Sequence, residues 1–316
     1  MIYLILVPLF FLVMVLYIRI ADHYNIIDHP NERSSHSKIT IRGGGIIFIF
    51  AAFAAVIMHT EYWLPVLGIF IVGTISFLDD LITLSGKIRI FFQLVSVTLL
   101  FVCLKIFTYL PFYDCIMLYI LFIGIINAYN FMDGINGITG TYSIVIFGAL
   151  QYINLHEVAF IEPDMIWLPI VASGVFLFYN FRTRAKCFAG DVGSVSIAFW
   201  VTLLLLDLII ATHNWGYILF LAVYGVDSIF TIVHRIILKQ NIFKAHRLHF
   251  YQILANERKI PHLVVSTAYA AVQLLIIIVV IRYKDLPFFI LFLLIVIPLA
   301  ATYLIFKTRL MRRTLK

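Results

Sequence analysis

Residues 287–306 read PFFILFLLIVIPLAATYLIF, twenty consecutive positions without one charged side chain. A helix needs about 20 apolar residues to cross the hydrocarbon core of a bilayer. Similar runs recur along the chain, at residues 1–20, 43–59, 64–78, 90–108, 114–130, 141–155, 165–180, 193–211, 215–233 and 263–281. The pattern predicts an all-α fold, a polytopic transmembrane helical bundle with about 10 to 11 spans.

The composition agrees with this prediction. The chain has 316 residues, of which 63% are hydrophobic and 12% are charged, whereas soluble domains carry about half apolar and a quarter charged residues. Lipid can solvate the excess apolar surface. No internal repeat, low-complexity tract or flexible linker interrupts the sequence, so residues 1–316 are interpreted as a single integral membrane domain. The three cysteines lack the spacing of a metal site.

The basic residues predict an orientation. If the spans alternate in direction, twenty of the twenty-three Lys and Arg residues fall on loops of one side. The positive-inside rule makes that side cytoplasmic, with the N-terminus outside and the C-terminus inside. The same residues form short clusters between apolar runs and no continuous basic surface, so the expected partner is the lipid bilayer and not nucleic acid.

Polar residues collect on these predicted cytoplasmic loops. In the first loop, Lys38 and Arg42 precede three glycines at a helix entry, where exposed backbone amides and cations attract phosphate. The alternative is a positive loop with a flexible helix entry. In the second loop, Asp79 and Asp80 end an apolar run, and Lys87 and Arg89 follow. Adjacent carboxylates suit hydrated Mg²⁺, although the two cations could simply neutralise a solvated helix end.

The third loop carries Asn127, Asn130, Asp133 and Asn136, spaced by three. On a helix these side chains would form one slowly drifting stripe, which is costly in lipid and indicates a wet or ligand-filled interior. Polar packing between helices is the alternative.

The fourth and fifth loops add a carboxylate and a cationic cluster. Asp191 stands between Gly190 and Gly193 at a predicted helix start, where it could cap the helix or ligate a metal. His246, Arg247 and His249 lie on the longest cytoplasmic segment, and they could bind a pyrophosphate. A basic amphipathic helix on anionic lipid would have a similar composition. Together the loops predict a divalent cation between anionic substrates.

With these five loops in order, residues 28–252 resemble the polyprenyl-phosphate N-acetylhexosamine-1-phosphate transferases, glycosyltransferase family 4, and in particular the branch that initiates O-antigen lipopolysaccharide and capsule. The resemblance implies a Mg²⁺-dependent enzyme of class EC 2.7.8.-, with Mn²⁺ as an alternative metal, in the bacterial plasma (inner) membrane. Such an enzyme transfers an N-acetylamino-sugar-1-phosphate from a UDP-sugar, such as UDP-N-acetylglucosamine, to undecaprenyl phosphate. It releases UMP in the first membrane step of surface polysaccharide or cell-wall synthesis, and a homodimer is compatible with the family.

The resemblance also assigns roles by position. Asp79 and Asp80 match the family's Asp-Asp pair, and Asp191, with Asp80, is the expected metal ligand. Catalytic or phosphate-handling roles fall to His246, Arg247 and His249. The expected substrate-binding residues are Asn127, Asn130, Asp133, Phe188 (stacked on uracil), Lys38, Arg42 and Lys87. Asn136 stands where many members have a second aspartate, so it cannot act as a charged ligand or base.

Two other classes of function would account for part of this pattern. A transporter or flippase for an anionic substrate would also place carboxylates in membrane spans, but its site should lie near the bilayer midplane, and here the acids fall at loop junctions. A catalytically silent scaffold would leave so many costly polar groups without a use.

Overall fold

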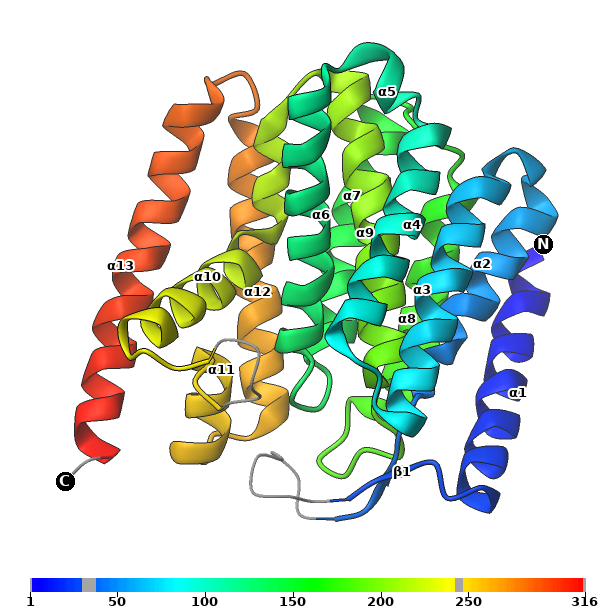
Figure 1. Ribbon diagram of the computed structural model, residues 1–316, viewed down its shortest axis with the longest axis horizontal. Helices are drawn as coiled ribbons and strands as arrows, with labels where there is room; N and C mark the ends of the chain where they lie inside the picture. Colours follow the sequence, from blue (N-terminus) through cyan, green and yellow to red (C-terminus); the bar gives the residue numbers. More distant parts are fainter. Residues whose placement is uncertain (1, 30–37, 242–246, 315–316) are drawn as a thin grey trace.

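The computed structural model describes residues 2–29, 38–241 and 247–314, which form a bundle of long helices (Figure 1). The main helices are α1 (Ile2–His23), α2 (Ile47–Met58), α3 (Trp63–Ile82), α4 (Gly86–Cys103), α6 (Phe112–Met132), α7 (Ile138–His156), α8 (Asp164–Asn180), α9 (Gly190–Thr212), α10 (Ala222–Ile237), α12 (His262–Arg282) and α13 (Phe288–Thr314). Short helices are α5 (Ile106–Tyr109) and α11 (Phe250–Gln252), with 3₁₀ turns at Gly44–Ile46, Thr60–Tyr62 and Trp215–Leu221 and a π-helical segment at Ile253–Glu257.

The predicted fold class is confirmed. Among the described residues, nine helices are long and apolar enough to cross a membrane, and two shorter apolar helices, Gly44–Met58 and Asp164–Asn180, join them. These eleven elements coincide with the eleven apolar runs of the sequence, so the protein is a multi-pass helical membrane protein.

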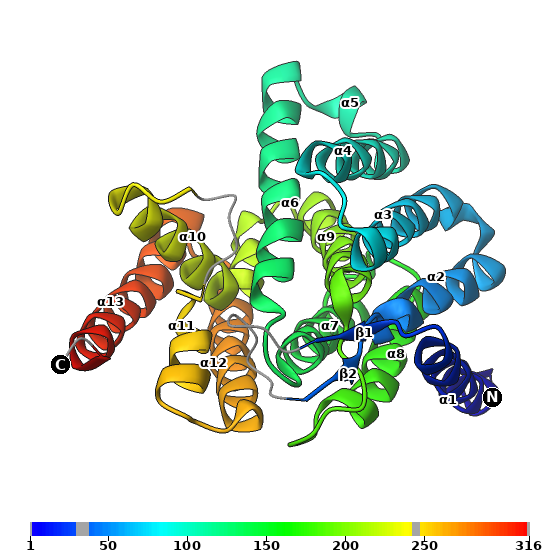
Figure 2. The ribbon, with the colours of Figure 1, turned by 60° about the horizontal axis from the view of Figure 1, so that its bottom comes forward.

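Helix α9 forms the core of the bundle. It packs against α2, α3, α6, α7 and α8, and in Figure 2 it lies between α1 and α13, which occupy opposite edges. The start of α9 can approach its neighbours closely because Gly193 lies against Gly45, and a Cβ on Gly45 would overlap the Gly193 backbone. The outer helices α1 and α13 instead expose many large apolar side chains, such as Leu4 and Phe289, which lipid can solvate.

Most of the polar connections lie at one end of the bundle. In Figure 1 the end of α1, strand β1 (Ile27–Asp28), α11 and the end of α13 share this lower end, and α5 lies at the opposite one. This arrangement fits the alternating directions that the sequence predicted. Which end faces the cytoplasm stays a prediction.

A two-stranded hairpin ties the first polar loop to the fourth. Strand β1 pairs antiparallel with β2 (Thr40–Ile41), and Ile41 forms an isolated parallel bridge with Cys187. Beyond it, Gly44 N–H donates to the Phe188 carbonyl at 2.8 Å and Gly45 N–H to the Ala189 carbonyl at 3.0 Å. Residues 40–45 and 187–189 therefore behave as one structural unit.

The predicted polar stripe of the third loop is wrong as a single helical face. Helix α6 ends at Met132, Asp133 follows as its C-cap residue, and Gly137 adopts a positive φ of 85°. Asn136 consequently lies outside the helix, where its amide donates to the Arg182 carbonyl at 2.7 Å. The glycines of this loop broke the periodicity that the spacing suggested.

Candidate active site

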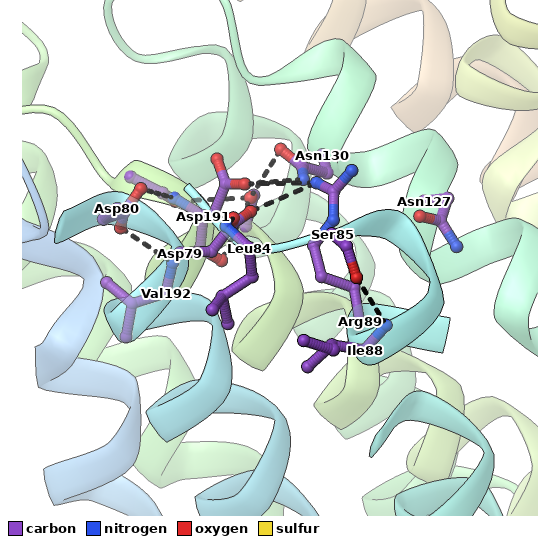
Figure 3. Close-up of polar contacts among 12 residues, drawn as sticks. Asp79, Asp80, Leu84, Ser85, Ile88, Arg89, Asn127, Asn130, Asp191 and Val192 are labelled. Carbon is purple, nitrogen blue, oxygen red and sulfur yellow. Dashed lines mark hydrogen bonds and ion pairs between the residues drawn. The ribbon is translucent and has the colours of Figure 1, made fainter. Parts of the chain in front are cut away.

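The ends of four helices bring charged side chains together at the polar end of the bundle (Figure 3). Asp79 and Asp80 come from the last turn of α3, and Arg89 from the first turn of α4. Asn130 comes from the last turn of α6 and Asp191 from the first turn of α9. Residues from four of the five loops that the sequence singled out thus surround one site, because Arg42 also reaches it.

Asp80 caps a helix other than its own. Its Oδ1 accepts a hydrogen bond from Asp191 N–H at 2.9 Å, and its Oδ2 accepts one from Val192 N–H at 3.2 Å. These amides open α9, whose N-cap residue Ala189 has no side chain that can accept them. Arg42 Nε lies 2.7 Å from Asp80 Oδ1, and the Asp80 side chain is fully buried. Asp80 is therefore held on all sides by the protein.

Asp191 is consequently relieved of the capping role. Its carboxylate accepts a hydrogen bond from Asn130 Nδ2 at 3.3 Å and lies 3.3 Å from Arg42 Nη2 and 3.8 Å from Arg89 Nη1. Its side chain is still 20% exposed. These long contacts on a partly exposed carboxylate leave it available to a ligand.

Asp79 faces Asp191 directly. Arg89 Nη1 lies 3.2 Å from Asp79 Oδ2 and 3.8 Å from Asp191 Oδ2, so the two carboxylates lie close together beside one guanidinium nitrogen. Two ionised carboxylates repel each other at such a distance unless a proton or a cation lies between them. The cluster holds three carboxylates against the guanidinium groups of Arg42 and Arg89, which leaves one negative charge uncompensated.

This charge balance fits a divalent cation. Mg²⁺ uses one or two protein carboxylates and fills its other positions with water and substrate phosphate, and Asp79 with Asp191 offers such a pair. Within the described residues, no group of three Asp, Glu, His or Cys side chains is arranged for a metal, so the pair would need ligands from outside the protein. Burial lowers the pKa of Arg42, but Asp80 and Asp191 raise it by more, so its pKa lies above the ordinary value and it stays charged.

A cationic cavity opens on the same loops. Its volume is about 720 Å³, which lies in the range of pockets that bind small molecules. Its wall includes four cations and several amide or aromatic groups: Lys38, Arg184, Arg247, Lys259, Asn136, Asn256, His262 and Phe188. Phe188 stands three residues before Asp191, so one short segment contributes to the cavity and to the carboxylate cluster.

The sequence comparisons point to one family. The family described as glycosyl transferase family 4 matches residues 62–209. A probable undecaprenyl-phosphate N-acetylglucosaminyl 1-phosphate transferase of Bacillus subtilis is 30% identical over 258 residues, covering 75% of this chain and 71% of that protein. The chain belongs to glycosyl transferase family 4.

More distant members match a smaller share. An undecaprenyl-phosphate alpha-N-acetylglucosaminyl 1-phosphate transferase of Escherichia coli is 29% identical over 211 residues, covering 60% of this chain and 57% of that protein. A phospho-N-acetylmuramoyl-pentapeptide-transferase of Lactobacillus helveticus is 29% identical over 184 residues, covering 49% of this chain and 56% of that protein. The chain thus spans little more than half the length of these two relatives.

Several residues predicted from the family pattern lie beside the carboxylate cluster or in the wall of the cationic cavity. Asn127 donates to Gln93 Oε1 at 3.0 Å next to Asn130, and Thr139 donates to Asp133 Oδ1 at 2.6 Å. Burial raises the pKa of Asp133 to about 7. Lys38, Phe188 and Arg247 lie in the wall of the cavity.

Other predicted residues lie apart from the cluster. Lys87 is exposed at the start of α4, whereas Arg89, which the sequence interpretation treated as a neutralising charge, contacts Asp79 and Asp191. His249 is buried, with Nδ1 3.3 Å from Asp227 Oδ1. His246 lies outside the described residues. Between Arg247 and Pro261, the helical residues run from Phe250 to Glu257, as α11 and the π-helical segment, and Tyr251, Gln252 and Ile253 are buried in the bundle.

Two residues that the contacts single out, Arg89 and Asp227, were given no site role from the sequence. Arg89 follows Lys87 by two positions, and the start of α4 at Gly86 turns only Arg89 toward the acids. Asp227 stood inside an apolar run and was not singled out. A lone acid within a predicted span is itself a signal, because an intramembrane charge is costly and needs a partner.

Proposed function

We propose that the protein transfers an N-acetylamino-sugar-1-phosphate from a UDP-sugar to undecaprenyl phosphate and releases UMP. The printed names of the relatives from Bacillus and Escherichia support the lipid acceptor and the sugar phosphate. The observation that carries the proposal is the pair of carboxylates, Asp79 and Asp191, which share Arg89 as a contact, lie near Arg42 and adjoin a cationic cavity. Both substrates are anions, so a site that joins them must balance negative charge.

The donor nucleotide is assigned to the cavity. Phe188 offers an aromatic face for a base, and Lys38, Arg184, Arg247 and Lys259 offer charge for a diphosphate. In the reaction, an oxygen of the lipid phosphate attacks the phosphorus that bears the sugar, and the bond to the nucleotide phosphate breaks, so that UMP leaves. These cations would stabilise the charge that gathers on the departing UMP.

The carboxylate cluster is assigned to the metal and the acceptor. Asp191 and Asp79 are the proposed Mg²⁺ ligands, which moves the second ligand from Asp80 to its neighbour because Asp80 is occupied by α9. Bound Mg²⁺ would neutralise phosphate charge at this point. The second pKa of a phosphate monoester is near about 6, so the acceptor is already largely a dianion at neutral pH and needs orientation more than deprotonation. Arg89, beside Asp79, can orient it.

Cytoplasmic placement of this end, with the N-terminus outside, follows from the distribution of basic residues. A role in initiating O-antigen or another surface polysaccharide belongs to the same proposal. The transporter alternative gains no support, because the carboxylates lie at the ends of helices (Figure 3), whereas an alternating-access site is expected near the midplane.

The test is a reconstitution in detergent, where no sealed compartment exists. Purified protein should release UMP only when a UDP-N-acetylamino sugar, a polyprenyl phosphate and Mg²⁺ are all present. Asp191→Asn should abolish release, whereas Asp114→Asn, the same change in the first turn of α6 at the opposite end, should not. UMP release without lipid phosphate would make the protein a hydrolase, and no release with any UDP-sugar would refute the proposal.

A further inference from the structure

Asp227 is a carboxylate buried in a membrane-spanning helix. It lies on α10 with 1% of its surface exposed, in the segment Trp215–Ile237 that is long and apolar enough to span a bilayer. A buried charge of this kind is costly and must be compensated by hydrogen bonds. It is distinct from the carboxylate cluster, since none of the contacts recorded for Asp79, Asp80 or Asp191 involves it.

Its compensating donors come from three other helices. Oδ1 accepts a hydrogen bond from Phe250 N–H at 2.9 Å and lies 3.3 Å from His249 Nδ1. Oδ2 accepts one from the Tyr269 hydroxyl at 2.7 Å and a longer one from Tyr251 N–H at 3.4 Å. The Tyr303 hydroxyl of α13 approaches at 3.4 Å. One carboxylate therefore joins α10 to α11, α12 and α13.

The two amides that Asp227 accepts are the first of α11, so the carboxylate fixes the start of the segment that follows. Residues 247–263 supply eight of the sixteen residues that line the cationic cavity. They include two of its cations, Arg247 and Lys259, and the polar side chains of Asn256 and His262. The place of that wall depends on where α11 begins.

A second contact joins α11 to the end of α6, beside the carboxylate cluster. The Tyr251 hydroxyl donates to the Phe131 carbonyl at 2.9 Å, one residue beyond Asn130, which itself binds Asp191. Gly134 makes room for this hydroxyl, because a Cβ there would overlap it. Displacing α11 would thus disturb the wall of the cavity first and the end of α6 second.

We infer that Asp227 is a positioning residue, which holds segment 247–263 as the wall of the donor-binding cavity. This inference rests on the proposed function, because it takes the cavity to receive the nucleotide sugar. Asp227 contacts no reacting group in this assignment. It acts through α11, so its loss should weaken binding of the UDP-sugar more than it slows the transfer itself.

The experiment compares Asp227→Ala and Asp227→Asn with a matched control, Asn154→Ala. Asn154 holds a loop at the opposite end of the bundle, where it accepts hydrogen bonds from Phe160 and Ile161 N–H at 2.9 and 3.1 Å. Its loss also removes buried hydrogen bonds, without touching the cavity. For each variant, KM for the UDP-sugar, KM for the polyprenyl phosphate, kcat and the hydrogen–deuterium exchange of residues 247–263 are measured.

For Asp227→Ala we expect a rise of about tenfold or more in KM for the UDP-sugar, a change of less than about threefold in kcat, and faster exchange at Phe250 and Tyr251. The Asn variant, which keeps one acceptor oxygen, should fall between the parent and Ala. If the Ala variant fails to fold, the Asn variant and Tyr269→Phe, which removes a single donor, provide the same comparison.

Unchanged donor KM and unchanged exchange in a folded Asp227 variant would overturn the inference. The inference would also be overturned if Asp227→Ala and Asn154→Ala raised KM for the UDP-sugar and KM for the polyprenyl phosphate to the same extent. A general loss of stability would then explain the effect. If the parent protein releases no UMP with any UDP-sugar, the proposed function fails on its own. The exchange of residues 247–263 then still decides whether Asp227 positions this segment.

Discussion

The different roles assigned to Asp80 and Asp191 predict opposite results for two substitutions. Asp80→Ala removes the acceptor for Asp191 N–H and Val192 N–H at the start of the central helix and leaves Arg42 without its 2.7 Å partner. Hydrogen bonds to charged groups contribute about 1.5 to 3 kcal/mol each, and breaking a buried ion pair costs about 3 to 5 kcal/mol. Because these terms overlap, we expect a loss of about 4 kcal/mol in the free energy of unfolding.

The assay is thermal unfolding of the purified protein in detergent. At about 2 °C per kcal/mol, the value for larger domains, Asp80→Ala should lower Tm by about 8 °C. Asp191→Asn, whose contacts are 3.3 Å or longer and whose repulsion with Asp79 is relieved, should stay within about 1 °C of the parent while losing activity. A folded Asp80→Ala protein that melts within about 1 °C of the parent would refute the capping role.

Three further predictions concern Arg89, Asp133 and the orientation of the protein in the membrane. Arg89→Ala should reduce UMP release by at least about tenfold, whereas exposed Lys87→Ala should change it by less than twofold, and equal effects would contradict the assignment of Arg89 to the site. Burial raises the pKa of Asp133 from 3.8 to about 7, so between these two pH values the folded protein holds a proton that the unfolded chain has lost. The free energy of unfolding should therefore fall as pH rises from about 4 to about 7. In a series of Tm measurements across this range, Asp133→Asn should show a flatter slope than the parent. In a protein whose native cysteines are replaced, Lys87→Cys should react with an impermeant thiol reagent only after the cells are opened. Thr108→Cys, also at an exposed position, should react in intact cells. The reverse pattern would show that the predicted orientation is wrong. The native Cys187 cannot serve for this purpose, since burial raises the pKa of its thiol to about 12.

The fold was largely predictable because a bilayer sets the length of each apolar run. Within the described residues, the eleven predicted runs correspond to eleven apolar helices. The differences lie at the helix ends; helix α9, for example, begins three residues before the predicted Gly193 and includes Asp191. Hydropathy does not report where a helix starts, because capping depends on residues far away in the sequence. The cap of α9 comes from Asp80, 111 positions earlier.

The candidate site was predictable as a set of loops but less so as a set of contacts. The loop order identified Asp79, Asn130 and Asp191 as neighbours, since each ends or begins a helix on the same side of the bundle. The loop order could not tell which of the two adjacent aspartates caps α9 and which lies beside Asp191. It also could not separate Lys87 from Arg89, because that choice depends on the rotation of α4 about its axis.

The division of the site into a carboxylate cluster and a cationic cavity explains why small residues gather between the two. Phe188 faces the cavity and Asp191 the cluster, and the backbone between them is held by Gly44 and Gly45 N–H. A Cβ on Gly44 would overlap the Cys187 side chain, and one on Gly190 would overlap the Asp80 carboxylate. If the nucleotide lies in the cavity as proposed, with its base on Phe188, then the phosphate that meets the metal at Asp191 must lie at the fixed separation between those two residues. The pairing of residues 40–45 with 187–189 would then set the length of donor that can reach the acceptor phosphate.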